Sequence, residues 1–293
     1  MRILITGSNG QLGRSIIKYK PKEIEIFSLT KQEFNLINQD QCKMIIEGIR
    51  PNWIINCAAY TNVDKAENEY RIAHEVNTLA PSFLTECVDN VNGKLLHIST
   101  DYVFNGMQSK PYKPFDKTNP LNNYGLTKAK GEDKLLEFDN NIILRTSWLY
   151  SSFGHNFVTT MLKLHNSKGM NNEKINVVYD QISAPTSSNN LAKLCWRVIT
   201  ENIIAQPDMR IIHWHDGGVT SWYDFAISIG EIAKKRGIVD YSAKVVPVKT
   251  SEYKVAAARP HYSLLDIGIT EKRLNIISNH WRDELEKTIE ELL

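Results

Sequence analysis

Short apolar runs alternate with segments of helical periodicity through the first half of the chain. The first run, ILIT, leads through three glycines into an amphipathic segment, and further runs follow as IEIFSL, WIINCAA, KLLHIST and NIILRTSW. Between them lie stretches such as QDQCKMIIEGI, in which apolar residues recur at helical spacing. This alternation is typical of a parallel sheet covered by helices on both faces. Residues 1–150 are therefore predicted to form a doubly wound α/β domain, a Rossmann fold.

The second half, residues 151–293, has a less regular pattern. Strand candidates INVVYD, RIIHWH and KVVPV lie among helix candidates such as SWYDFAISIGEIAKKRG and HWRDELEKTIEELL. We expect this part to build mainly a smaller substrate-binding lobe, with some segments returning to the Rossmann domain. Because open parallel sheets bind ligands at the carboxyl ends of their strands, the lobe is expected to cover that edge.

Composition favours a globular protein that acts on a small molecule. The 293 residues carry a formal net charge of +2 with basic and acidic residues interspersed, so no nucleic-acid surface is indicated. Four cysteines stand far apart without a CxxC pair, and neither a signal peptide nor a long apolar span is evident. We expect a cytoplasmic protein with reduced, buried thiols and no membrane contact.

A GxxGxxG turn follows the first predicted strand. Glycines there permit a tight strand-to-helix turn and the close approach of a pyrophosphate, which the N–H groups of the helix start would bind. A glycine-rich connection without a ligand is the alternative, but the position between strand and helix favours dinucleotide binding. The residues expected to contact the cofactor here are Gly7, Asn9, Gly10, Gln11, Leu12 and Gly13.

The end of the second predicted strand bears on the choice of cofactor. NAD-binding folds usually place an acid there, about 20 residues beyond the glycines, to hold the adenosine ribose. This chain has Thr30 and Lys31 instead, and Arg14 opens the first helix. These groups could receive a 2′-phosphate, so NADPH is the favoured cofactor and NADH the alternative. Solvated surface charge is the competing interpretation.

Tyr124 and Lys128, in NNYGLTKAKGE, stand four residues apart and share one face of a predicted helix. A free phenol titrates near 10, so useful proton transfer at neutral pH asks for a shift of roughly 3 units, or about 4 kcal/mol. An adjacent ammonium and the positive end of a cofactor would supply that shift by favouring the phenolate. Taken alone, a tyrosine and a lysine at this spacing are more often an ordinary pair on a helix surface than a catalytic pair.

Hydroxyl groups at the end of KLLHIST change that balance. Ser99, Thr100 and Asp101 emerge at the ligand edge of the sheet, where a threonine hydroxyl can bond a substrate carbonyl and the phenol together. The glycine turn, this strand end and the Tyr–Lys pair stand in an order that resembles the extended short-chain dehydrogenase/reductase family.

Longer blocks narrow the resemblance. GSNGQLG, NCAAYTNVDKAE, HEVNTLAP, STDYVFNG, LRTSWLY, DQISAPT and RPHYSLLD are spread over almost the whole chain. They resemble the corresponding blocks of the dTDP-4-dehydrorhamnose reductases, a branch of that family. The resemblance implies an NAD(P)H-dependent enzyme that reduces the C4 ketone of dTDP-4-dehydro-L-rhamnose to dTDP-L-rhamnose for cell-surface polysaccharide synthesis.

The same resemblance implies roles for individual residues. It makes Tyr124 the proton donor to the C4 alkoxide, Lys128 the group that holds the nicotinamide ribose and lowers the pKa of the tyrosine, and Thr100 the partner of the carbonyl oxygen. The other residues implied in substrate binding are Asp101, Tyr102 and Trp148, although a buried core tryptophan is the alternative at position 148. The other residues implied along the cofactor are Ala58, Ala59, Tyr60 and Asn77.

One departure from the family concerns metal. Some members bind magnesium at a dimer contact through a glutamate shortly after the APT segment, where this chain has Asn189 and Asn190. An amide is a poor substitute for a carboxylate toward a hard cation, so we expect no metal site, and a homodimer, if formed, not bridged by magnesium. The glutamates of the last helix, Glu284 to Glu291, then become a solvated face.

Two other functions fit the same fold. A nucleotide-sugar dehydratase would carry a glutamate after Asp101, where this chain has Tyr102, and an epimerase would generally keep the acidic ribose ligand. A partner-binding protein, such as the regulatory β subunit of methionine adenosyltransferase, would be free to lose catalytic groups. The presence of Thr100, Tyr124 and Lys128 argues against that reading.

Overall fold

A parallel sheet of six strands organises the larger lobe of the computed structural model, which describes residues 1–203 and 209–293. The strand order is β10-β5-β4-β3-β1-β2, and all neighbouring pairs run parallel. The winding reverses beside β1 and β3, the position at which doubly wound sheets bind ligands. The strands are β1 (Arg2–Thr6), β2 (Glu25–Leu29), β3 (Trp53–Asn56), β4 (Lys94–Thr100), β5 (Asn141–Thr146) and β10 (Ile211–Trp214). The predicted fold class is confirmed.

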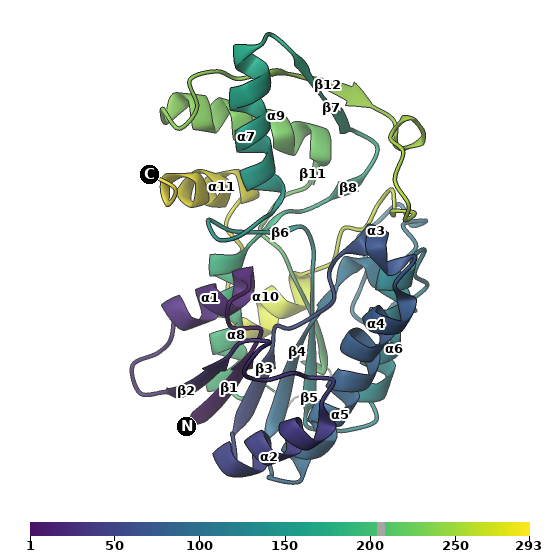
Figure 1. Cartoon of the computed structure of the whole chain (residues 1–293), viewed down its shortest axis with the longest axis vertical. Coiled ribbons are helices and arrows are strands. Elements are labelled where there is room, and N and C mark those ends of the chain that lie inside the picture. The colour runs from purple at the N-terminus through teal and green to yellow at the C-terminus, as the bar shows by residue number, and fades with distance from the viewer. Residues whose placement is uncertain (204–208) are drawn as a thin grey trace.

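Helices cover both faces of this sheet, which explains why its central strands are apolar on both sides. Every residue of β3 and β5 is buried. The helices of one face are α1 (Gln11–Lys18), α8 (Ser188–Thr200) and α10 (Gly268–Leu274), and those of the other are α2 (Gln39–Ile49), α5 (Ala80–Asp89) and α6 (Asn123–Leu135) (Figure 1). The indole of Trp196 donates to the carbonyl of Ile16 at 3.0 Å and so fixes α8 against α1.

The pattern RIAHEVNTLAPSFLTECV predicts one helix, but the structure divides it. It contains α4 (Tyr70–His74), a π-helical turn η1 (Glu75–Leu79) and then α5. Pro81 lacks the N–H that would bond the carbonyl of Asn77 four residues earlier, and a widened turn accommodates that loss. The remaining short helices of this lobe are α3 (Val63–Ala66) and the 3-10 turn η2 (Asp101–Val103).

The smaller lobe is built around a second apolar cluster. Tyr150, Phe225 and Trp281 lie at its centre, with the ring of Phe225 in edge contact with both of the others. Its helices are α7 (Phe157–Met170), α9 (Trp222–Lys235) and α11 (Trp281–Glu290). The remaining strands form two-stranded pairs: β6 (Leu149–Tyr150) with β9 (Thr186–Ser187), β7 (Lys174–Val178) with β12 (Lys244–Val248), and β8 (Ile182–Ser183) with β11 (Thr220–Ser221), and a 3-10 turn η5 (Thr250–Glu252) follows β12.

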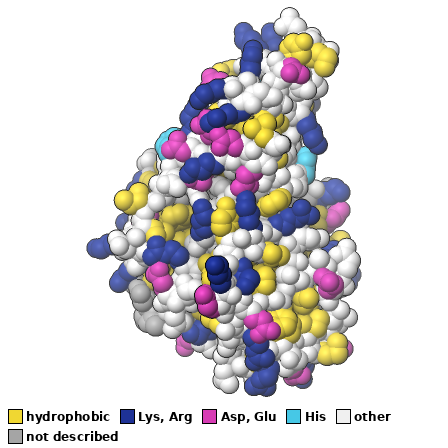
Figure 2. Space-filling view, turned by 90° about the vertical axis from the view of Figure 1, so that its left-hand side faces the viewer, with side chains coloured by type: hydrophobic (Ala, Val, Ile, Leu, Met, Phe, Trp, Pro, Cys, Tyr) yellow, Lys and Arg dark blue, Asp and Glu magenta, His cyan; other side chains and the backbone are white. Residues whose placement is uncertain are grey.

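Segments from the second half of the sequence complete the larger lobe. The run RIIHWH forms β10, which pairs with β5 at the edge of the main sheet, and α8 and α10 pack on that sheet (Figure 1). Charged side chains of both signs are interspersed on the face drawn in Figure 2. Within the described ranges, no helix combines the length and the apolarity that crossing a bilayer requires.

Candidate active site

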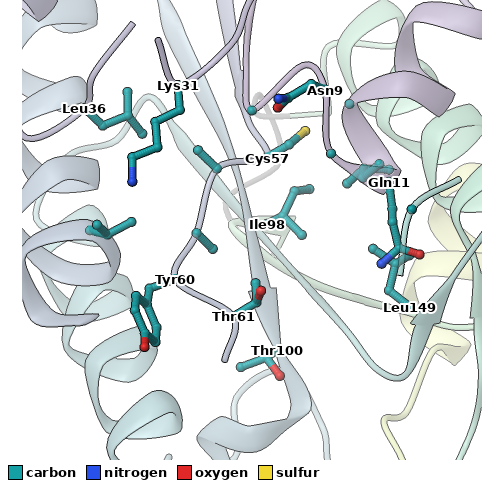
Figure 3. Close-up of a pocket in the computed structure, with 18 of the residues that line it drawn as sticks. Asn9, Gln11, Lys31, Leu36, Cys57, Tyr60, Thr61, Ile98, Thr100 and Leu149 are labelled. Carbon is teal, nitrogen blue, oxygen red and sulfur yellow. The ribbon is translucent and has the colours of Figure 1, made fainter. Parts of the chain in front are cut away.

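A cavity of about 910 Å³ opens at the carboxyl ends of β1, β3, β4 and β5. The turn after each strand contributes to its wall, with Gly10 after β1, Ala58 after β3, Thr100 at the end of β4 and Trp148 after β5. Asn9 and Gln11 lie on one side of the cavity and Tyr60 on the other, with Thr100 at the strand end between them (Figure 3). Side chains far apart in sequence therefore meet at the switch point of the sheet.

The glycine turn is shaped to receive phosphate. Gly7 has a φ of +61°, and a Cβ there would lie 2.9 Å from the backbone nitrogen of Ala58. A Cβ on Gly13 would lie 2.7 Å from the Cα of Ser8. Helix α1 starts at the cavity with Gly10 as its N-cap and no side-chain cap, so its first N–H groups are available to an anion. These features fit the pyrophosphate of a dinucleotide.

The wall after β3 is held from behind by an asparagine. Asn77, on the π-helical turn, accepts from the backbone N–H of Tyr60 at 2.9 Å and donates to its carbonyl at 3.0 Å. Its amide also donates to Thr127 of α6 at 3.1 Å. Tyr60, Ala58 and Ala59 line the cavity, whereas Asn77 does not. Asn77 thus fixes the Tyr60 backbone, and its expected contact with the cofactor stays a prediction.

Basic residues lie at one end of the cavity. Lys31 and Arg14 line it, and the guanidinium of Arg14 lies 5.6 Å from the ring centre of Phe153. Thr30 is not among the residues that line it, and both its N–H and its hydroxyl donate to the carboxylate of Glu33 at 2.8 Å. Of the residues predicted to favour NADPH over NADH, Lys31 and Arg14 are thus the ones that border the cavity.

Tyr124 lies in the first turn of α6, directed at the end of β4. Asn122 caps this helix by accepting from the N–H of Gly125 at 2.8 Å, and Gly125 leaves room for the carbonyl of Tyr102 to approach. Burial raises the pKa of Tyr124 to about 12, although a hydrogen bond from Thr100 works in the opposite direction. The two hydroxyl groups predicted to act together are therefore adjacent.

Lys128 follows one turn later on α6 and is 1% exposed. Its Nζ lies 2.9 Å from Nε2 of His97 and donates to the carbonyl of Ile98 at 2.7 Å. Burial lowers the pKa of Lys128 to about 8. In the protein without cofactor, burial of the phenol raises the pKa of Tyr124. The lowering expected from this ammonium together with the positive end of a bound cofactor stays a prediction.

Asp101 and Tyr102 lie behind the cavity wall rather than on it. Asp101 is 2% exposed and accepts hydrogen bonds from Thr100 at 3.1 Å and from Ser263. Burial raises its pKa to about 7. Tyr102 is hydrogen-bonded to Arg259, which also pairs with an acid of α3. Both residues attach the 259–263 segment to the strand end that bears Thr100, and the sugar contacts expected of them stay a prediction.

Trp148 is half-buried and lines the cavity, so it is not a core tryptophan. Its φ is +43°, a left-handed conformation that is strained for a bulky residue. The indole stacks on Trp222 of α9, with ring centres 3.6 Å apart and planes 11° apart. The smaller lobe thus stabilises the orientation of an aromatic side chain at the site.

A buried ion pair lies behind the strand end that bears Thr100. Arg145 of β5 and Glu132 of α6 form a forked contact, in which Nη2 donates to Oε2 at 2.6 Å and Nε to Oε1 at 3.0 Å, and both side chains are at most 3% exposed. Ser99, the neighbour of Thr100, donates to the same carboxylate. The sequence contained a signal for this pair, since Arg145 interrupts the apolar run NIILRT, but its partner could not be assigned from the sequence.

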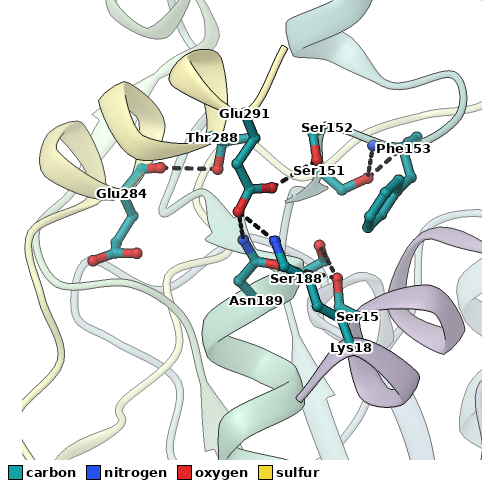
Figure 4. Close-up of polar contacts among 10 residues, drawn as sticks. All are labelled: Ser15, Lys18, Ser151, Ser152, Phe153, Ser188, Asn189, Glu284, Thr288 and Glu291. Carbon is teal, nitrogen blue, oxygen red and sulfur yellow. Dashed lines mark hydrogen bonds and ion pairs between the residues drawn. The ribbon is translucent and has the colours of Figure 1, made fainter. Parts of the chain in front are cut away.

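The position considered for magnesium is occupied by an internal polar cluster (Figure 4). The Glu291 carboxylate accepts from Lys18 of α1 at 2.6 Å, from Asn189 of α8 at 2.9 Å and from Ser152 at 2.8 Å. Glu284 is only 4% exposed, so the expected solvated face is wrong at that position. No group of three or more potential metal ligands occurs among the residues that the structure describes.

Comparison with known proteins assigns the chain to a family. The model of the RmlD substrate binding domain matches residues 1–293. The chain belongs to this family. An RmlD relative from Aggregatibacter actinomycetemcomitans, dTDP-4-dehydrorhamnose reductase, is 39% identical over 289 residues, which cover 97% of each chain. The resemblance inferred from the sequence blocks is confirmed.

Solved structures of the RmlD family have the same architecture. A dTDP-4-dehydrorhamnose reductase from Clostridium acetobutylicum is 37% identical, with a TM-score of 0.91 and coverage of 100% of this chain and 99% of the other. The Bacillus anthracis reductase, solved in complex with NADP, is 36% identical, with a TM-score of 0.87 and coverage of 99% of both chains.

Proposed function

We propose that the chain reduces the C4 ketone of dTDP-4-dehydro-L-rhamnose to dTDP-L-rhamnose with NADPH, for cell-surface polysaccharide synthesis. The carrying observation is that Thr100, Tyr124 and Lys128 line one cavity together with the uncapped glycine turn. The names of the full-length relatives and the NADP complex of one of them support the choice of substrate and cofactor. NADH is the alternative cofactor.

Backbone N–H groups and cationic side chains would hold the cofactor together. The N–H groups at the start of α1 would bind the pyrophosphate, Lys31 and Arg14 the 2′-phosphate, and Lys128 the nicotinamide ribose. When bound, the dihydronicotinamide supplies a hydride. Ala58 and Ala59 keep the wall after β3 thin where the cofactor passes.

Proton transfer falls to Tyr124. With a pKa raised to about 12 by burial, its phenol is protonated at neutral pH and serves as a donor rather than as a base. An alkoxide is a far stronger base than a phenolate, so transfer to the C4 oxygen is downhill. Thr100 orients the carbonyl oxygen and the phenol through its hydroxyl, and Trp148 offers an apolar face to the deoxysugar ring.

We also infer that the protein works in the cytoplasm and that any homodimer forms without a bridging magnesium. The carboxylate of Glu291 is already neutralised within the chain by Lys18, and Asn189 donates to it as an amide. Both contacts disfavour a hard cation at this position.

The activity is tested by mixing the purified protein with dTDP-4-dehydro-L-rhamnose and NADPH. We expect loss of nicotinamide absorbance with equimolar formation of dTDP-L-rhamnose, which NMR identifies. Tyr124→Phe, which keeps the ring, is the matched control and should be nearly inactive. A folded protein that binds NADPH but consumes none would refute the proposal, and so would an isomerised sugar without net NADPH consumption.

A further inference from the structure

A row of buried polar side chains runs beneath the site from β1 to α6. Thr6, Asn56 and His97 are paired in register across β1, β3 and β4, so their side chains share one face of the sheet. The hydroxyl of Thr6 donates to Oδ1 of Asn56 at 2.6 Å, and Nδ2 of Asn56 lies 3.0 Å from Nδ1 of His97. Nε2 of His97 then lies 2.9 Å from Nζ of Lys128. All four side chains are at most 1% exposed.

The protonation state of Lys128 decides which groups of this row donate hydrogen bonds and which accept them. A neutral imidazole carries one N–H, so only one of its nitrogens can donate. If the amide of Asn56 donates to Nδ1 of His97, Nε2 carries the proton and donates to Lys128, which must then be a neutral amine that donates to the Ile98 carbonyl at 2.7 Å. If Lys128 is an ammonium, Nε2 accepts, Nδ1 carries the proton, and the oxygen of Asn56 must face it.

The neutral imidazole can therefore hydrogen-bond Lys128 as an amine or as an ammonium. An imidazolium and an ammonium cannot coexist at this distance. Burial of the ring and, to a lesser extent, the proximity of Lys128 hold the pKa of His97 well below its usual range, so the ring stays neutral. Glu132 on the same helix favours the ammonium but is already paired with Arg145, and Tyr124 is neutral at physiological pH.

We propose that His97 is a positioning residue for the reaction: its imidazole, oriented by Asn56, holds Nζ of Lys128 beneath the site and accommodates that nitrogen both as ammonium and as amine. This inference rests on the proposed function only in that Lys128 is the lysine of the proposed site. No contact of His97 with substrate or cofactor is required, since the ring is fully buried.

His97→Leu removes both the acceptor and the donor, whereas His97→Gln restores an amide that can turn either end toward Lys128. Hydrogen bonds to a charged group are the stronger ones, so the loss should destabilise the ammonium more than the amine. We expect His97→Leu to lower the titration midpoint of Lys128 by about one unit, with His97→Gln close to the unaltered protein. The turnover number should fall about 10-fold or more in His97→Leu and recover in His97→Gln, with little change in the KM for the ketone.

The midpoint is read by NMR of protein labelled with ¹³C at lysine Cε, with the Lys128 signal assigned by its loss in Lys128→Arg. This reading needs no turnover, so it stands even if the proposed substrate is wrong. His165→Leu is the matched control, because His165 is an equally buried histidine of the smaller lobe that bonds the Ala226 carbonyl at 2.9 Å. An unchanged Lys128 midpoint in folded His97→Leu, or an equal shift in His165→Leu, would overturn the proposal.

Discussion

Lys128 should impose an alkaline limit on the capture of NADPH. Its pKa is lowered by burial to about 8. The ammonium is the form best suited to bind a ribose hydroxyl of the cofactor. The ammonium fraction is about one half at that pH, about a tenth near pH 9 and about a hundredth near pH 10. We therefore expect kcat/KM for NADPH to fall along the same curve.

The assay is initial-rate NADPH oxidation at saturating ketone between pH 6 and pH 10, because kcat/KM reports the groups of the free enzyme. Tyr124 cannot cause this alkaline decrease in kcat/KM, since its pKa of about 12 lies beyond this range. Lys128→Arg is the control. Its guanidinium stays protonated throughout, so the activity that remains should show no alkaline decrease in kcat/KM. A decrease in kcat/KM with a midpoint at pH 10 or above, or an identical decrease in Lys128→Arg, would show that the buried lysine does not control the binding of NADPH.

Three further perturbations test other parts of the site. Tyr124→Phe should lower kcat by about 10²- to 10⁴-fold while the Kd for NADPH, followed by its fluorescence, changes little; comparable losses in both would argue against a proton donor. Gly13→Ala should weaken NADPH binding by more than about tenfold, because its Cβ would collide with the turn that begins at Gly7; calorimetry showing normal affinity would contradict the fit. Arg145→Met should cost about 3–5 kcal/mol in urea unfolding, because it leaves Glu132 buried without its ion-pair partner. The double variant Arg145→Met/Glu132→Leu should recover most of that loss, and additive losses would refute the ion-pair explanation.

The sequence was sufficient wherever the signal was local. Alternating apolar runs gave the sheet and its helices, and Gly7, Thr100 and Tyr124 line the cavity as anticipated because each stands at the carboxyl end of a strand or the start of the next helix. Their positions depend on the backbone near them, which short patterns describe well.

What the sequence could not supply depends on contacts between distant segments. His97 is a polar residue in an apolar strand, but its partner Lys128 is known only from how α6 lies on β4. Asp101 turns away from the cavity because it bonds Ser263, far along the chain. The upward shift of the Tyr124 pKa in the protein without cofactor could not be predicted for the same reason, since the depth of burial is set by tertiary packing and not by residue spacing.

The sixth strand of the main sheet limits how the chain can be divided. β10 and α8 come from beyond residue 180, yet β10 hydrogen-bonds the edge of β5 and α8 shields the apolar side of α1. A fragment ending near residue 150 would leave an unpaired strand edge and an uncovered patch around Ile16, both of which favour self-association. The nucleotide-binding half is thus not an autonomous unit, and recombining it with a foreign sugar-binding half would require the donor to bring its own closing strand.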